Sequence, residues 1–315
     1  MVPSFLKSRS RLLDYSTVAF LATVWGLTWP FTIVALRYSD PLMIASLRSI
    51  IGGVGLWAWR ARSTSKEPFN SRFFWVTFVA GTCWVGIPMA LMAWALQYIS
   101  GGLGSIFQST APFFVAIFAY FMLREPLLSA AKIFGLIIGF IGIILLFSDD
   151  IGGPSGGSAV VAGAAVLLTS VLIGFAQVYS RKYFKGSDLL GFNMYVLLVA
   201  GFETLPFCFV GGAPRFSLTT ELVLSILYLG VMGSAVPFVL YFELFQRVNI
   251  VVLSMVSYLI PVVAVVSGIV WLGERMTPTD VLGACLVLFG VLLATQYQVI
   301  KSKLHARLVS KRMTL

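Results

Sequence analysis

Hydroxyl side chains recur at helical spacing ahead of a proline at two places in the chain. Ser105 and Ser109 precede Pro112 by seven and three residues, and Ser254 and Tyr258 stand at the same distances before a second proline. On an α-helix these intervals place the polar groups on one face. Such a face can hydrogen-bond a small molecule held between helices. The same small residues can instead serve close helix packing.

Aromatic side chains could line the same site. Trp25 and Trp29 lie four residues apart within an apolar segment, too deep to be anchors at a membrane surface. We interpret them as lining a site for an apolar or aromatic molecule, with lipid-facing positions as the alternative. Further candidates for the lining are Trp84, Trp94, Gln177, Tyr179, Phe238 and Tyr241.

Charged residues inside apolar segments are the other candidates for function. Arg48 lies seven residues into such a segment, where a charge costs roughly 2.5–3.5 kcal/mol. It should therefore face the protein interior, and we favour a structural or gating contact over direct substrate binding. Glu243 could accept a proton or bind a cation, but Arg247 four residues on favours an ion pair. Glu203 carries the same ambiguity.

Several kinds of chemistry are disfavoured by what the sequence lacks. Cys83, Cys208 and Cys285 each stand alone in an apolar segment, and the single histidine, His305, lies in a basic tail. Neither a zinc site nor a Ser-His-Asp triad is expected within the apolar segments. No GxxxxGK[ST] motif occurs, so ATP is not expected as the direct energy source. No cofactor or metal is expected.

Composition indicates where these residues are placed. Hydrophobic residues make up 59% of the 315 positions and charged residues 11%, against about 25% in soluble domains. An all-α integral membrane protein is the class that fits. The net charge of +10 is spread in short clusters between apolar segments, so we expect no nucleic-acid partner.

The apolar segments predict ten transmembrane helices. Each is long enough to cross a hydrocarbon core of roughly 30 Å. Their expected spans are 17–38, 41–60, 72–97, 101–123, 127–147, 158–181, 188–210, 220–244, 250–272 and 278–298. With the N-terminus inside, 18 Lys and Arg residues fall on the cytoplasmic side and 3 on the other. This bias predicts that both termini are cytoplasmic.

The chain repeats itself with a shift of 149 residues. Pro88, Gln97, Ser105, Pro112 and Glu125 fall on Pro237, Gln246, Ser254, Pro261 and Glu274. Five helices per half is an odd number, so the second half should be inverted relative to the first. The expected parts are a first repeat at 12–148, an external linker at 149–157, a second repeat at 158–298 and a basic cytoplasmic tail at 299–315. The duplicated glutamates predict a repeated contact between a turn and a backbone or basic neighbour.

Four stretches carry a family resemblance. They are WGLTWPF (25–31), PLMIASLRSIIGG (41–53), GLGSIFQSTAPFFVAIFAYFMLREPL (102–127) and LSMVSYLIPVVAVVSGIVWLGERMTPTDVLGACLVLFGVLL (253–293). The chain resembles EamA-type transporters of the drug/metabolite transporter superfamily. The resemblance implies inverted five-helix repeats and a central cavity lined mainly by helices 1, 3, 4, 6, 8 and 9. Glu203 and Glu243 depart from the family pattern.

We therefore expect a secondary transporter in the cell membrane that exports amino acids or similar amphipathic metabolites by alternating access. Multidrug or organic-cation efflux is the main alternative, and a non-transporting structural or regulatory membrane protein is another. An intramembrane enzyme is disfavoured, because no dyad or metal cluster is expected at membrane depth. The expected partners are a small-molecule substrate and the lipid bilayer, with the protein as a monomer or homodimer.

Overall fold

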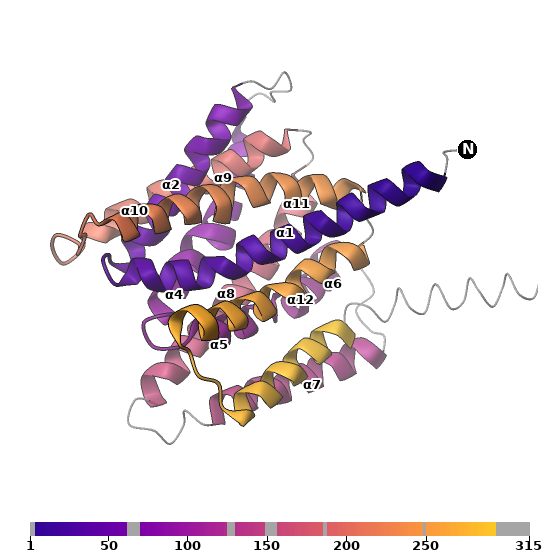
Figure 1. Cartoon of the computed structure of the whole chain (residues 1–315). Coiled ribbons are helices and arrows are strands. Elements are labelled where there is room, and N and C mark those ends of the chain that lie inside the picture. The colour runs from indigo at the N-terminus through magenta and orange to yellow at the C-terminus, as the bar shows by residue number, and fades with distance from the viewer. Residues whose placement is uncertain are drawn as a thin grey trace, which may run out of the picture.

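The computed structural model describes residues 4–61, 70–124, 130–148, 156–184, 188–247 and 250–293. These residues are almost entirely helical, with one isolated β-bridge between Ser39 and Phe216 (Figure 1). The first half contains α1 Ser4–Leu36, α2 Pro41–Arg60, α3 Ser71–Ala80, η1 Gly81–Gly86, α4 Ile87–Ala95, α5 Gly101–Gln108, α6 Ala111–Leu123 and α7 Ala130–Ser148. The second half contains α8 Gly156–Tyr183, α9 Leu189–Thr204, η2 Leu205–Phe209, α10 Thr220–Leu227, η3 Tyr228–Ala235, α11 Val236–Arg247, α12 Ile250–Ser267, η4 Gly268–Leu272 and a last helix over Pro278–Leu293.

Seven of the described helical segments are long and apolar enough to cross a membrane. They are Leu13–Leu36, Pro41–Arg60, Ser71–Ala95, Gly101–Leu123, Gly157–Tyr183, Leu189–Phe209 and Thr220–Tyr241. Three shorter apolar helices cover Ile137–Leu146, Leu259–Leu272 and Pro278–Leu293. Each of the ten predicted segments thus contains helix, while a count of ten crossings stays a prediction.

Local sequence explains where the helices begin and break. The side chains of Asn70, Ser100 and Thr219 accept hydrogen bonds from backbone N–H groups three residues on, which satisfies donors at the helix start. The predicted helix 101–123 is broken after Gln108, because Pro112 has no N–H and its ring collides with the carbonyl four residues earlier. Pro261 lies inside α12 without ending it.

Close glycine contacts join the two halves in reciprocal pairs. Gly26 of α1 meets Val263 of α12, and a Cβ on this glycine would lie 2.5 Å from the valine Cβ. A Cβ on the equivalent Gly174 of α8 would likewise lie 2.7 Å from the Cβ of Phe114 of α6. Gly26 and Gly174 are equivalent at a shift of 148 residues, which also relates Asp40 to Asp188, and Phe114 and Val263 are equivalent at the shift of 149. The same contact is therefore made twice, with the halves exchanged.

The α2 and α9 helices, which are equivalent in the repeat, run antiparallel to each other. Arg60 at the end of α2 forms an ion pair of 2.5 Å with Asp188, which caps the start of α9. At the other end, Asp40 before α2 accepts a hydrogen bond of 2.8 Å from the backbone N–H of Arg215, which follows α9. Asp40 and Asp188 are themselves equivalent in the repeat. A twofold axis that exchanges two antiparallel helices is perpendicular to both of them, which is the arrangement found in inverted repeats.

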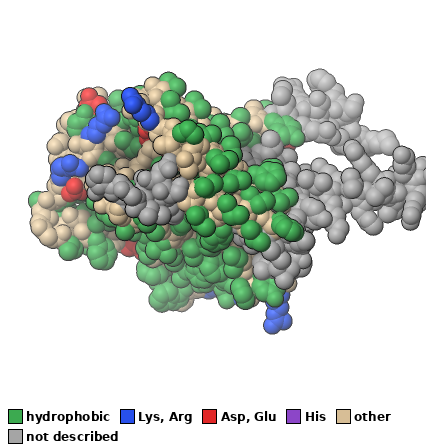
Figure 2. All heavy atoms as spheres, turned by 90° about the horizontal axis from the view of Figure 1, so that it is seen from below, with side chains coloured by type: hydrophobic (Ala, Val, Ile, Leu, Met, Phe, Trp, Pro, Cys, Tyr) green, Lys and Arg blue, Asp and Glu red, His purple; other side chains and the backbone are tan. Residues whose placement is uncertain are grey.

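The last helix and α7 also pair antiparallel through glycines. Gly142 lies against the carbonyl of Gly283, and Gly290 lies against that of Gly135. Figure 1 shows these two helices side by side at one edge of the bundle. The outer face of α7 exposes Phe134, Phe140 and Ile144 by more than half of their surface. Hydrophobic side chains cover much of the face seen in Figure 2, as contact with lipid requires.

Candidate functional site

Four aromatic side chains, which we call the aromatic group, meet where the two halves face each other. Trp25 of α1 lies 6.3 Å from Phe238 and 5.5 Å from Tyr241 of α11, measured between ring centroids. The ring of Trp84 of η1 also lies 5.9 Å from that of Phe238. Edge-on and tilted rings at these distances attract one another through their quadrupoles. The group therefore ties α1 and η1 of the first half to α11 of the second.

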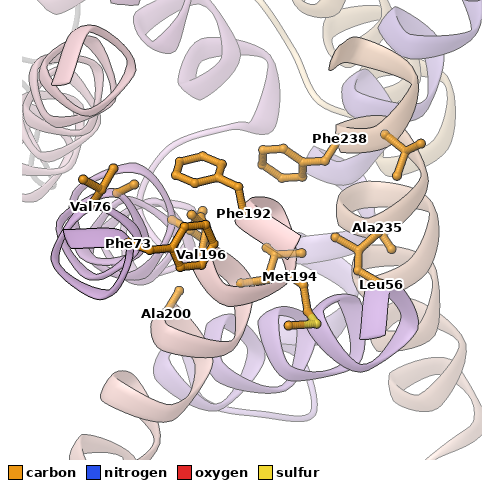
Figure 3. Close-up of a cluster of buried hydrophobic side chains, with 13 residues drawn as sticks. Leu56, Phe73, Val76, Phe192, Met194, Val196, Ala200, Ala235 and Phe238 are labelled. Atoms are coloured by element: carbon orange, nitrogen blue, oxygen red, sulfur yellow. The ribbon is translucent and has the colours of Figure 1, made fainter. Parts of the chain in front are cut away.

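The aromatic group continues into a buried apolar cluster. Phe238 points toward Phe192 of α9 in this cluster, which also contains Leu56 and Ala235 (Figure 3). Tyr179 of α8 packs against the same cluster and lies 4.7 Å from the ring of Tyr183. The structure thus brings together five of the predicted lining residues, namely Trp25, Trp84, Tyr179, Phe238 and Tyr241.

Other predicted lining residues lie elsewhere. Trp29 is 2% exposed and packs on Gly104 of α5, whose added Cβ would lie 2.5 Å from the indole. Trp94 pairs with Tyr98 at 5.1 Å and belongs to a different apolar cluster. Gln177 is half-buried on α8.

The two hydroxyl stripes are only partly described. Ser105 and Ser109 are buried, and their hydroxyl groups donate to the carbonyls of Gly102 and Ile106 in their own turns. Local bonds of this kind satisfy the hydroxyl donors without a ligand. The side chains of Ser254 and Tyr258 lie outside the described residues, although both positions fall in α12.

Three π-helical segments in the described part of the chain, η1, η3 and η4, were not anticipated from the sequence. The η1 and η3 segments interrupt membrane-length helices, and the shift of 149 residues places Gly81–Gly86 within Tyr228–Ala235. A π turn disturbs the regular backbone ladder and is often found at functional sites. In η3, the carbonyl of Gly233 accepts a hydrogen bond of 3.2 Å from the Trp25 indole N–H. The feature of the sequence that could have indicated η1 and η3 was the pair of equivalent glycines, Gly81 and Gly230.

Arg48 of α2 lies against η3. Arg48 is 3% exposed, and its Nη2 atom lies 3.5 Å from the hydroxyl oxygen of Ser234. The Nε atom is buried and has no hydrogen-bond partner. Within the described residues, Arg48 forms no ion pair with any carboxylate. The guanidinium therefore faces the protein interior, as its place in an apolar segment predicted.

Two carboxylates at membrane depth differ in their surroundings. Glu243 is exposed on α11, and the side chain of Arg247, its predicted partner, lies outside the described residues. Glu203 of α9 accepts a hydrogen bond of 2.6 Å from the Thr82 hydroxyl of η1, and its second oxygen is buried against Gly86. The hydrogen bond from Thr82 thus attaches Glu203 to the η1 segment.

Glu274 holds the start of α5. Its two carboxylate oxygens accept hydrogen bonds of 2.8 and 3.2 Å from the backbone N–H groups of Gly101 and Gly102. A carboxylate at a helix N-terminus also interacts favourably with the helix dipole. The predicted contact of this glutamate with backbone is confirmed. Its counterpart Glu125 lies outside the described residues.

We expect Glu274→Ala to destabilise the folded protein by about 1–3 kcal/mol, because two partly buried N–H groups lose a charged acceptor. The thermal unfolding midpoint of purified protein in detergent measures this effect. Glu221→Ala is a matched control, since Glu221 lies on an exposed first turn of α10. Equal midpoints for the two variants would contradict the assigned role.

The geometry defines a class of protein. Paired helical repeats, an apolar outer surface and an interior site of aromatic rings, hydroxyl groups and one guanidinium can bind a molecule within a membrane. Among the described residues, no group of three His, Cys, Asp or Glu side chains could hold a metal ion.

Comparison with known proteins agrees with this class. The model of the EamA-like transporter family matches residues 15–148 and again 161–296. The "uncharacterized transporter YoaV" of Bacillus subtilis (strain 168) is 28% identical over 278 residues, which cover 86% of this chain and 93% of that protein. The "uncharacterized inner membrane transporter YedA" of Escherichia coli (strain K12) is 25% identical, with 92% and 93% covered.

A solved protein chain shares the fold at a TM-score of 0.63 and 19% identity, covering 92% of this chain and 97% of its own length. Because the family model matches most of the sequence in two copies, the chain belongs to the EamA-like transporter family. It is a multi-pass membrane transporter and not an enzyme.

Proposed function

We propose that the protein exports small organic metabolites, namely amino acids or similar amphipathic compounds, across the cell membrane by alternating access. The observation that carries this proposal is the reciprocal packing of equivalent helices. Because α2 and α9 are equivalent and antiparallel, two repeats at 12–148 and 158–298 would be inverted relative to each other. Inverted repeats can exchange their conformations, which opens one shared site to either side of a membrane in turn.

The proposed topology has ten crossings and places both termini in the cytoplasm. It rests on the distribution of Lys and Arg, which favours one side by 18 to 3. The antiparallel pairing of α7 with the last helix supports an even count in which helices 5 and 10 also cross in opposite directions. The 149–157 linker would then be external.

Cysteine labelling tests this topology. A membrane-impermeant thiol reagent added to intact cells should modify Ser155→Cys and spare Ser65→Cys, each in a background without native cysteines. Both positions lie outside the described residues. Permeabilised cells provide the control, because both cysteines should then react. Labelling of Ser65→Cys alone in intact cells would refute the proposed orientation.

The proposed substrate site includes the aromatic group. Aromatic faces supply apolar contact area, and a few polar groups in a site of this kind fix the orientation of a ligand. A neutral or zwitterionic molecule with an apolar body suits such a lining. Aromatic faces also attract organic cations, which keeps cation efflux as the competing substrate class.

Counterflow in proteoliposomes tests the function. Vesicles that contain only this protein and are loaded with unlabelled solute should take up labelled phenylalanine or threonine faster than empty vesicles. A labelled quaternary ammonium compound tests the cation alternative, and a sugar phosphate serves as the negative control. Exchange of the sugar phosphate with none of the other three moving would refute the proposed site. No exchange of any solute by folded protein would favour a non-transporting role.

A further inference from the structure

We infer that Arg48 binds the carboxylate group of the transported molecule, which makes the substrates amino acids or other small organic acids rather than organic cations. The inference rests on the proposed transport function and narrows its substrate class. It assigns a ligand-binding role to a residue whose place in an apolar segment suggested a structural or gating contact.

The first step is the unused hydrogen-bonding capacity of the guanidinium. Arginine carries five N–H donors and is charged at every relevant pH. Arg48 is 3% exposed, so bulk solvent reaches very little of this side chain. Its hydrogen bond to Ser234 is 3.5 Å long, and Nε has no partner. A buried charge normally has a counter-charge and good hydrogen bonds.

The second step is that no carboxylate among the described residues serves as a counter-charge for Arg48. The described ion pairs join Arg60 to Asp188 and Arg215 to Asp40 at the two ends of α2, and neither reaches Arg48. The carboxylate of Glu203 is held by Thr82 on η1. An anion brought by the substrate can supply the counter-charge that the described residues do not.

The third step is the position of Arg48 beside the aromatic group. Gly233 is close to both, because its carbonyl accepts from the Trp25 indole and a Cβ on it would lie 3.4 Å from Nη2 of Arg48. The same added Cβ would lie 2.8 Å from the methyl group of Thr28. The tight contact at this glycine is therefore with Thr28, and the guanidinium lies at ordinary van der Waals distance from the position of that Cβ on η3. A ligand could therefore place a carboxylate at Arg48 and its apolar body against Trp25 and Phe238.

The fourth step is the match of charges. One guanidinium pairs with one carboxylate through two parallel hydrogen bonds. A cation at the same place would be repelled by the uncompensated charge of Arg48. A sugar phosphate carries more negative charge than this single guanidinium can balance. The observations thus favour molecules with one carboxylate and an apolar or aromatic body.

The test compares three probes that share a phenylethyl skeleton and differ in their charged groups. Phenylalanine has both charged groups, 3-phenylpropionate has only the carboxylate, and phenethylamine has only the amine. Purified wild-type protein in proteoliposomes should exchange labelled phenylalanine, and 3-phenylpropionate should compete with it far better than phenethylamine. Loss of the charged hydrogen bonds in Arg48→Gln should weaken inhibition by 3-phenylpropionate about tenfold to a hundredfold. Competition by phenethylamine should stay the same or improve.

Two further variants keep the test decisive. Arg37→Gln applies the same substitution to an exposed arginine at the end of helix 1 and should leave the order of the competitors unchanged. Arg48→Lys keeps the charge but loses the paired geometry, so it should retain part of the carboxylate preference even if Arg48→Gln does not fold. A purely structural role for Arg48 would weaken all probes equally.

Each outcome decides between the inference and the proposed function. Exchange that is competed equally well by the amine and the carboxylate, or that keeps its carboxylate preference in both Arg48 variants, overturns the inference and leaves transport intact. Robust exchange of the quaternary ammonium compound with no competition by either carboxylate also overturns it. Failure of folded wild-type protein to exchange any probe overturns the proposed export of such metabolites, and the inference with it.

Discussion

Arg60→Met should lower the free energy of unfolding by about 3–5 kcal/mol, the largest effect expected from a single substitution outside the binding site. Only 2% of the Asp188 side chain is exposed, and both Nε and Nη2 of Arg60 donate to one of its oxygens. Removal of Arg60 takes away the two charged hydrogen bonds that this buried carboxylate accepts from the guanidinium. The midpoint of thermal unfolding in detergent, followed by intrinsic fluorescence, measures the loss.

The opposite end of the same helix pair provides the matched control. Arg215 and Asp40 are 54% and 43% exposed in their side chains, and their ionic atoms are 3.7 Å apart. An exposed pair of this kind contributes about 0–1 kcal/mol, so Asp40→Asn should change the midpoint little. The double variant Arg60→Met/Asp188→Leu should recover much of the lost stability, because no charge is then left buried at this site. The contribution of the hydrogen bond that Asp188 accepts from the Gly191 N–H would still be missing. Equal losses at both ends would show that burial does not control the effect.

Gly290→Ala should destabilise the protein by about 1–3 kcal/mol or more, because the added methyl group meets backbone atoms that cannot rotate away. Its carbon would lie 2.5 Å from the carbonyl oxygen of Gly135 and 2.6 Å from the nitrogen of Gly139. The last helix and α7 would have to separate to make room. The reciprocal Gly142→Ala meets the carbonyl of Gly283 at 2.7 Å and should have a similar effect.

Gly55→Ala is the control for these substitutions. It adds the same methyl group inside α2, where the nearest atom would be the Cβ of Ala235 at 3.6 Å, an ordinary contact. Alanine in a helix interior is favoured over glycine by roughly 0.5–1 kcal/mol, so this variant should be neutral or stabilised. Unfolding midpoints of the three variants in one detergent provide the comparison. A stabilised Gly290→Ala would contradict the close packing of the last helix on α7.

Much of the fold could be predicted because membrane helices leave strong one-dimensional signals. Apolar length marked each helical segment, and the two matching proline and glutamate positions indicated the repeat. The contact of Glu274 with backbone followed from the same duplication. Trp25, Phe238 and Tyr241 were identified as site candidates by their aromatic type and depth, and the structure places them together.

Other parts of the site depended on contacts between distant segments. Trp25 and Trp29 lie four residues apart, so the sequence places them on one face of α1. In the structure Trp29 is buried, and Gly104 of α5 packs against its indole. The π turns of η1 and η3 depend on how each helix accommodates its neighbour, so the matching glycines Gly81 and Gly230 do not by themselves specify them. The attachment of Glu203 to Thr82 joins residues 121 positions apart.

The sequence by itself determined the class of protein, the two repeats and the residue types available for binding, because hydropathy and periodicity are properties of single segments. Only the tertiary structure decided which of these residues meet. Arg48 illustrates the difference. Its burial followed from its position among apolar residues. Its lack of a counter-charge among the described residues, and the closeness of both Arg48 and Trp25 to Gly233, arise where α2, α1 and η3 come together. Partners in such contacts are chosen by three-dimensional packing, which spacing along one chain does not encode.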